Sequence, residues 1–209
     1  KGIFLGATYR LHPSITSFTS ELFYENRLTS KPELKTLSIE GSSNLSGAGL
    51  YYLPVNHFGR QTNCEEEVIE IKRIAERILH DKVKWTNRKG AKNFITKEDI
   101  LIVAPYNSQV KALLKVLAGF RIGTVDEFQG QEAPIVIYSI TCSSAEDAPR
   151  GMDFLYSPNR LNVATSRALC ICILVGSEQI FEAECRNVDQ MKWVNAFCRY
   201  RELASLIKL

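Results

Sequence analysis

The stretch Ile100-Leu-Ile-Val-Ala104 is apolar at every position, which is typical of a strand buried on both faces of a parallel sheet. Strand-like and helix-like patterns alternate from there to the C-terminus. The predicted segments are a helix over 107–118, strands over 121–125 and 134–141, an arginine-bearing helix, a strand over 170–175, and helices over 178–185 and 188–206. This alternation predicts an α/β fold with a mainly parallel sheet and helices on both faces.

The segments before this stretch are shorter and more varied. Residues 3–8 are apolar, and residues 12–23 have apolar side chains at helical spacing. The polar stretch 41–49, rich in glycine and serine, predicts a loop. Residues 50–55 predict an edge strand, because a proline such as Pro54 does not fit a central strand.

A second long helix is predicted after this strand. Asn63 is expected to cap its N-terminus, with Glu66 completing a capping box. The apolar stripe of this helix consists of Val68, Ile71, Ala75, Ile78 and Leu79. Residues 82–98 are charged and predict a surface insertion, whose basic residues are either a solvated face or a nucleic-acid patch.

Composition sets broad limits on the class of protein. With 209 residues, 45% hydrophobic and 23% charged, the chain is expected to form one soluble globular domain over residues 1–209. A net charge of +3 is too small to indicate a nucleic-acid partner by itself, so any basic patch must be local.

The six cysteines lack Cys-x-x-Cys spacing, and two of them, Cys170 and Cys172, lie in an apolar run. We therefore expect buried thiols in the reducing, intracellular environment of the cytoplasm (or of the nucleus in a eukaryote) and no metal site. No apolar run approaches the roughly 18 residues of a membrane span, so no membrane partner is expected. Because the chain begins with Lys1, we interpret it as part of a longer protein.

Two further segments carry the chemistry. Gly123-Thr-Val-Asp-Glu-Phe-Gln-Gly-Gln-Glu132 supplies carboxylates and amides directly after a predicted strand. Ser157-Pro-Asn-Arg-Leu-Asn-Val-Ala-Thr-Ser-Arg-Ala168 places Arg160 and Arg167 seven residues apart, which puts both near one face of a helix. Acceptors on a loop and arginines on a helix indicate phosphate chemistry.

Together these segments resemble motifs V and VI of superfamily 1 helicases, in the branch that includes the RNA helicase of nonsense-mediated decay and related DNA helicases. Thr8-Tyr-Arg-Leu-His-Pro-Ser14 resembles motif IV of that branch. The three motifs occur in the family's order, and the resemblance covers residues 8 to about 176. One departure lies at 165–166, where Thr-Ser replaces the family's Leu-Thr.

The phosphate-binding loop of that family has no counterpart here. No Gly-x-x-x-x-Gly-Lys-Ser/Thr occurs in the chain, and no Asp-Glu pair follows an apolar strand. The resemblance therefore implies the second, C-terminal RecA-like domain only. ATP and Mg²⁺ would be held mainly by a first RecA-like domain of the same protein, which makes that domain a partner.

The resemblance also assigns the residues that would face ATP. Arg167 matches the arginine finger of motif VI, which neutralises charge on the γ-phosphate in the transition state. Arg10 matches a second γ-phosphate ligand. Arg160 is either a further nucleotide contact or part of a salt bridge that orients the helix.

The remaining nucleotide assignments lie in motif V. Glu132 matches the glutamate that accepts hydrogen bonds from the ribose hydroxyls, and its alternative role is to cap a helix N-terminus. Gln129 and Gly130 are expected to shape its turn, since glycine permits a close backbone approach.

Single-stranded nucleic acid is the second implied ligand. Pro105 and Tyr106 resemble motif IVa, where the tyrosine stacks on a base, and Asn107 is expected to bond a phosphate, to cap helix 107–118, or both. Thr124 is a candidate phosphate donor, whereas Asp126 would repel a phosphate and is expected to orient a neighbour.

The sequence thus predicts the C-terminal motor domain of an ATP-dependent helicase or translocase, inactive on its own. DNA is favoured over RNA as the track, and the resemblance implies 5′-to-3′ movement. A fused nuclease is compatible with this branch. The alternatives are a non-catalytic RecA-like module that binds nucleic acid or protein, and a nucleotide-binding regulatory domain, which the missing phosphate loop disfavours.

Overall fold

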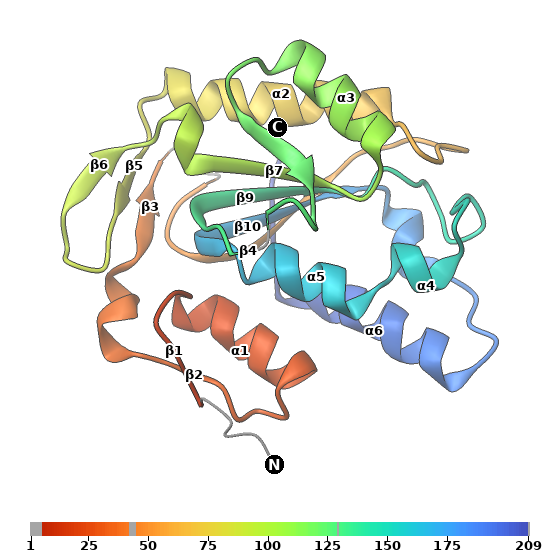
Figure 1. Ribbon diagram of the computed structural model, residues 1–209, viewed down its shortest axis with the longest axis horizontal. Coiled ribbons are helices and arrows are strands. Elements are labelled where there is room, and N and C mark those ends of the chain that lie inside the picture. The colour runs from red at the N-terminus through yellow and green to blue at the C-terminus, as the bar shows by residue number, and fades with distance from the viewer. Residues whose placement is uncertain (1–5, 42–44, 129, 209) are drawn as a thin grey trace.

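The computed structural model describes residues 6–41, 45–128 and 130–208. A central sheet lies between two layers of helices (Figure 1). Its strand order is β11-β4-β10-β9-β7-β8, and every neighbouring pair is parallel. The strands are β4 (Gly49–Pro54), β7 (Ile100–Ala104), β8 (Arg121–Thr124), β9 (Ala133–Ser139), β10 (Ala168–Gly176) and β11 (Ser205–Leu206).

The helices divide between the two faces of this sheet, as Figure 1 shows. One face carries α2 (Glu65–His80) and α3 (Asn107–Val116). The other carries α1 (Pro13–Phe23), α5 (Pro158–Thr165) and α6 (Val188–Leu203), with the short α4 (Met152–Leu155) beside them. The predicted α/β class is confirmed: this is a RecA-like parallel sheet with helices on both faces.

A smaller antiparallel sheet is formed by β3 (Ser38–Glu40), β5 (Lys84–Thr86) and β6 (Lys92–Phe94). Part of the predicted surface insertion at 82–98 is therefore a β-hairpin. Val83 and Ile95, at its base, are buried in the core under α2. The short strands β1 (Ala7–Thr8) and β2 (Thr29–Ser30) pair separately, and 3₁₀ turns lie at Pro32–Thr36, Lys97–Asp99 and Glu178–Glu182.

Both predicted helix caps are wrong. Helix α2 begins at Glu65 and is capped at Cys64, so Asn63 lies outside it, and Glu66 binds Arg60 instead of completing a capping box. Helix α3 is capped at Tyr106, and Asn107 is already its first residue. In both cases the asparagine that was expected to cap the helix lies one residue away from the true cap.

Two predictions near the edge of the sheet also need correction. The segment 178–185 contains a 3₁₀ turn over Glu178–Glu182 instead of a helix, and the last helix ends at Leu203. The chain then forms β11, which pairs with Tyr51 and Tyr52 of β4. Strand β4 is therefore not the outermost strand. Pro54 is tolerated because it ends the strand, beyond the residues that β11 covers.

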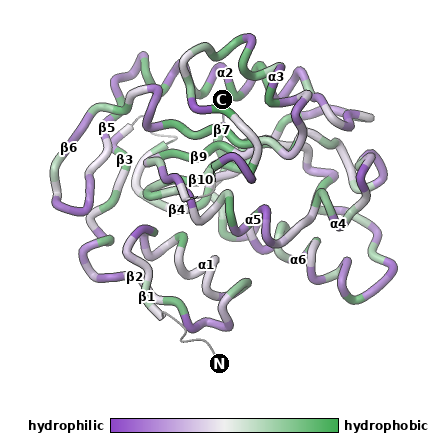
Figure 2. Tube along the Cα trace, in the orientation of Figure 1, coloured by the Kyte–Doolittle hydropathy of each residue, from purple (hydrophilic) through white to green (hydrophobic). Residues whose placement is uncertain are grey.

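The core lies on both faces of the sheet, because β7, β9 and β10 are buried at every position. Figure 2 shows hydrophobic residues concentrated in these central strands, whereas the turn between β5 and β6 is hydrophilic. Cys170 and Cys172 are buried in β10, as predicted. Among the described residues, no helix is long and apolar enough to cross a membrane.

Candidate functional site

A cavity of about 640 Å³ lies where β9 and β10 begin, and we call it the amino-edge cavity. Glu132 directly precedes β9, and Arg167 directly precedes β10, so the parallel strands bring both residues to the same edge. The cavity is lined by Ala7, Thr8, Tyr9, Arg10, Leu11, Thr19, Tyr24, Leu28, Arg88, Glu132, Asn162, Val163, Ser166 and Arg167.

Glu132 is the one carboxylate among these lining residues, and it faces two arginines. Its Oε2 lies 2.6 Å from Nε of Arg10, and its Oε1 lies 3.7 Å from Nη2 of Arg88. Arg10 also donates from Nη1 to the carbonyl oxygen of Ser166 at 3.4 Å. The carboxylate thus orients Arg10 towards the end of α5.

Arg167 has a different environment. Its Nε is buried and has no hydrogen-bond acceptor within the described part of the chain. Burial, and then the charge of nearby Arg10, lower the pKa of Arg167 from its ordinary value. A buried donor without an acceptor is costly, so an anion that entered the cavity would relieve this cost.

Asn162 contributes a second unsatisfied group to the same wall. Its Oδ1 is buried and has no donor partner among the described residues, while its Nδ2 donates to the hydroxyl of Tyr24 at 3.3 Å. The lining carries three arginines and one glutamate. This excess of positive charge suits a polyanionic ligand that also offers hydroxyl donors, such as a nucleoside polyphosphate.

The structure therefore brings Arg10, Glu132 and Arg167 together, as the motif resemblance implied. Gly130 adopts a φ of +88°, which favours glycine, in the turn before Glu132, and it does not line the cavity. Gln129 lies outside the described residues. Glu132 does not cap a helix, because a strand follows it directly.

The expectation that Arg160 and Arg167 share one helical face is wrong. Helix α5 ends at Thr165, so Arg167 lies in the turn before β10. Arg160, near the start of α5, lies at the opposite edge of the sheet and forms a 3.8 Å ion pair with Asp126. Arg160 is therefore not placed in the amino-edge cavity, and the salt-bridge alternative describes it better.

A second cavity, of about 460 Å³, lies where β7 and β8 end, and we call it the carboxyl-edge cavity. It brings together all four residues expected to contact nucleic acid. Its lining consists of Thr62, Pro105, Tyr106, Asn107, Ser108, Thr124, Asp126, Glu127, Arg150 and Arg160.

Aromatic and basic side chains share one side of the carboxyl-edge cavity. The guanidinium carbons of Arg150 and Arg160 lie 3.8 and 4.0 Å from the ring centroid of Phe154. The Tyr106 ring lies 5.2 Å from that of Phe154 and is only 6% exposed. Tyr106 is therefore largely covered by protein, which argues against an open stacking platform for a base.

The turn after β8 folds back so that the Glu127 side chain approaches the backbone of the strand closely. Glu127 accepts a hydrogen bond from the backbone N–H of Thr124 at 2.8 Å. A Cβ added to Gly123 would lie 2.2 Å from Oε2 of Glu127 and 3.0 Å from the Phe128 ring. A side chain at position 123 would therefore force the Glu127 carboxylate away from this hydrogen bond.

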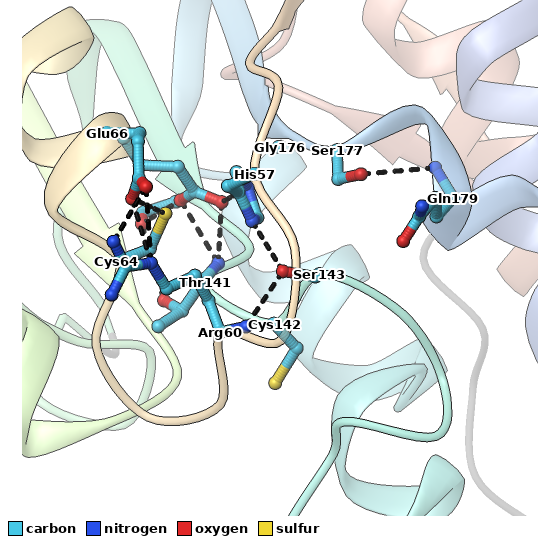
Figure 3. Close-up of polar contacts among 12 residues, drawn as sticks. His57, Arg60, Cys64, Glu66, Thr141, Cys142, Ser143, Gly176, Ser177 and Gln179 are labelled. Atoms are coloured by element: carbon cyan, nitrogen blue, oxygen red, sulfur yellow. Dashed lines mark hydrogen bonds and ion pairs between the residues drawn. The ribbon is translucent and has the colours of Figure 1, made fainter.

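A buried polar cluster lies beside the carboxyl-edge cavity. Glu67 of α2 is fully buried and accepts hydrogen bonds from the Ser139 hydroxyl and from the Thr141 N–H at 2.9 Å. Nε2 of His57 lies 3.1 Å from Glu67. Its Nδ1 lies 2.7 Å from the hydroxyl of Ser143 (Figure 3). Burial raises the pKa of Glu67 above its ordinary value.

This cluster also contains the donor atoms of His57, Cys64 and Glu67, which lie within 4.8 Å of one another. The Cys64 thiol, however, donates to Glu66, and burial raises its pKa well above the ordinary value. Since His57 and Glu67 are also hydrogen-bonded, we assign the cluster to holding loop 56–64 against the end of β9.

Sequence reasoning missed Arg88, Arg150 and Asn162 as cavity residues. Arg88 carried a weak signal, because it belongs to the charged segment 82–98. Asn162 lies within the quoted motif but was given no role. Arg150 reaches its cavity through tertiary packing on Phe154, which spacing along the chain does not reveal.

Proteins from other organisms are similar to this chain in sequence. The Danio rerio protein mov-10-B.1, named as a helicase, is 33% identical over 207 residues, which cover 84% of this chain and 19% of the relative. The Drosophila melanogaster protein armi, named as a probable RNA helicase, is 30% identical over 197 residues, covering 84% and 16%. The chain thus spans less than a fifth of the length of these relatives.

One solved structure is also similar. It is described as the C-terminal domain of a possible DNA helicase from Lactobacillus plantarum WCFS1, with 15% identity, a TM-score of 0.46, and coverage of 96% of this chain and 99% of that one. The fold assignment rests on the strand order and not on this likeness.

A family model described as an AAA domain matches residues 1–179, which is most of the 209 residues. Within this range lie both cavities, every residue predicted to serve in either, and all three quoted motifs. The chain therefore belongs to the AAA_12 family of AAA domains.

Proposed function

We propose that this chain is the C-terminal motor domain of an ATP-dependent superfamily 1 helicase or translocase. The observation that carries the proposal is the convergence of Arg10, Glu132 and Arg167 on one cavity, in which Nε of Arg167 has no acceptor among the described residues. Family membership and the helicase names of the relatives support it.

In this proposal the amino-edge cavity is one wall of an ATP site whose other wall belongs to a first RecA-like domain. Arg167 donates to the γ-phosphoryl oxygens, where negative charge accumulates in the transition state. Arg10, which is held by Glu132, lines the same cavity and would bind the same phosphate. The free lone pairs of Glu132 accept from the ribose hydroxyls.

The residues that line this cavity do not form a binding site for Mg²⁺. Glu132 is the one carboxylate there, and both of its oxygens already face arginines. The metal would therefore be held by carboxylates of the first domain, where it neutralises phosphate charge. The contribution of this chain is cationic.

The carboxyl-edge cavity is proposed to contact single-stranded nucleic acid. Arg150 and Arg160 would pair with the phosphates, and Asn107 would donate hydrogen bonds to them. Such contacts would not depend on the base sequence of the strand. The preference for DNA remains a prediction, and the name of one relative, a probable RNA helicase, favours RNA instead.

The first test compares the chain with the complete protein. We expect no measurable ATP hydrolysis by residues 1–209 alone, because the chain has no phosphate-binding loop. The full-length protein is expected to hydrolyse ATP faster when single-stranded nucleic acid is added. A coupled ATPase assay with and without an oligonucleotide measures both. A full-length protein that lacks a phosphate-binding loop would contradict the proposal.

The second test concerns the track. Replacing Arg150 with alanine in the full-length protein should weaken single-strand binding and reduce the slope of log K against log salt by about one. Lys192→Ala, a loss of the same charge outside both cavities, is the matched control. Fluorescence anisotropy with DNA and RNA of one sequence measures both variants and the preferred track. An unchanged slope for Arg150→Ala would remove this cavity from the track.

A further inference from the structure

The turn between β5 and β6 enters the amino-edge cavity, although it belongs to a separate small sheet and to none of the quoted motifs. Arg88 in this turn is one of the residues that line the cavity. Its Nη2 lies 3.7 Å from Oε1 of Glu132, and its Nη1 donates to the carbonyl oxygen of Tyr9 at 3.5 Å. A second guanidinium thus faces the carboxylate that holds Arg10.

The turn that carries Arg88 is closely hydrogen-bonded. The N–H of Asn87 donates to the carbonyl of Ala91 at 2.9 Å, and its side-chain oxygen accepts from the N–H groups of Lys89 and Ala91. Gly90 supplies the positive φ of +78° that the reversal needs. Thr36 donates to the carbonyl of Asn87 at 3.2 Å and fixes the turn to the chain before β3.

The hairpin is also anchored at its base. Val83 and Ile95 are buried in the core, and their backbones are joined by a 2.8 Å hydrogen bond. Lys92 of β6 forms a 2.6 Å ion pair with Glu40 of β3. Arg88 is therefore delivered to the cavity by a defined element and not by an unstructured loop.

The contacts of Arg88 are long, and half of its side chain is exposed, in contrast to the short Arg10–Glu132 pair. A weak, solvated pair of this kind is readily exchanged for a stronger one with a ligand anion. Glu132 would keep Arg10 as its partner after the exchange. Arg88 is thus free to turn towards a ligand without breaking the rest of the site.

We infer that Arg88 is an additional nucleotide-binding residue, whose guanidinium binds the polyphosphate chain of the nucleoside triphosphate at the rim of the cavity. This inference rests on the proposed function. Because Arg88 is solvated and lies at the rim, whereas Nε of Arg167 is buried, Arg88 strengthens binding of the ground state and the transition state equally. It acts on affinity and not on the chemical step.

The test uses the full-length protein and ATP. Arg88→Ala is expected to raise the KM for ATP, and the Kd of a non-hydrolysable ATP analogue, by about tenfold, which corresponds to one charge-assisted hydrogen bond. The kcat should stay within about twofold of the wild type. Lys89→Ala is the matched control, because it removes the same charge one residue away without touching the cavity lining.

The outcomes separate this inference from the proposed function. An unchanged Kd for Arg88→Ala, or a fall in kcat at constant KM, would overturn the role of Arg88 alone. The Kd of Arg88→Lys should lie between those of the wild type and of Arg88→Ala, since lysine keeps the charge but loses the fork of donors. If the wild-type full-length protein binds no ATP analogue, both the inference and the proposed function fail.

Discussion

Replacement of Arg167 with alanine in the full-length protein is expected to lower the kcat of nucleic-acid-stimulated ATP hydrolysis by about 10³-fold or more. Nε of Arg167 is buried and has no acceptor in the described part of the chain. Burial lowers the pKa of the Arg167 guanidinium, and the charge of Arg10 lowers it further. These conditions are unfavourable in the resting domain and are relieved when negative charge develops on a bound phosphate. The contribution of Arg167 should therefore be largest in the transition state.

Steady-state kinetics at saturating nucleic acid measure this effect. The KM for ATP should change little, which distinguishes Arg167 from Arg88. Arg167→Lys should recover only part of the rate, because an ammonium cannot present two parallel donors. Arg73→Ala, which removes a guanidinium from the solvent face of α2, serves as the control. If turnover by Arg167→Ala matches that of the wild type, Arg167 is not an arginine finger.

The second large effect concerns stability. Glu67→Ala should lower the free energy of unfolding by about 3 kcal/mol or more, because it leaves three buried polar groups without their partner, and each unsatisfied buried group costs about 1–3 kcal/mol. The groups left behind are His57, the Ser139 hydroxyl and the Thr141 N–H. Urea denaturation of residues 1–209 measures the change.

The neighbouring glutamate is a matched control. Glu66 is partly exposed and pairs with Arg60 at 2.7 Å, and the side-chain hydrogen bond from Arg60 lowers the pKa of Glu66 to about 2. Pairs at the surface contribute about 0–1 kcal/mol, so Glu66→Ala should have a small effect. Equal losses for Glu66→Ala and Glu67→Ala would contradict the role given to the buried cluster.

The pH dependence of stability tests the environment of Glu67 independently. Burial raises the pKa of Glu67 in the folded state above its ordinary value of 4.5. Its contribution to stability is therefore fully present below pH 4.5 and is lost as the pH rises through the raised pKa. Relative to Glu67→Gln, which cannot ionise, the wild type should lose up to about 1.4 kcal/mol per pH unit in that window. Parallel pH profiles would exclude this account.

The sheet could be predicted from sequence because its strands are apolar without interruption. Stretches such as 100–104 and 168–176 are incompatible with a solvated face, and their alternation with helical patterns leaves few topologies open. The edge could not be predicted in the same way. Strand β11 has two exposed residues, and its pairing with β4 spans most of the chain, so no local pattern reveals it.

The candidate site also contains residues that the sequence predicted and residues that it did not. Arg10, Glu132 and Arg167 were found through motifs that resemble a known family, and the structure then places them in one cavity. The error over Arg160 arose because the seven-residue spacing was read as a helical repeat, whereas α5 ends two residues before Arg167. Arg88 carried only a weak signal, because its place in the cavity depends on a hairpin whose base, at Val83 and Ile95, is packed into the core.

The two cavities lie at opposite ends of the parallel sheet, one at the amino ends of β9 and β10 and the other at the carboxyl ends of β7 and β8, and this placement has a mechanical consequence. Strand β10 has nine residues and therefore spans about 30 Å, and buried side chains cover both of its faces. A plate packed this densely resists compression and bending. In the proposed motor, a tilt imposed at the ATP edge would reach the nucleic-acid edge undiminished, as in a rigid lever. The size of a step would then depend on the lever's length and pivot, and substitutions in the surface loops would alter how often the motor steps rather than how far.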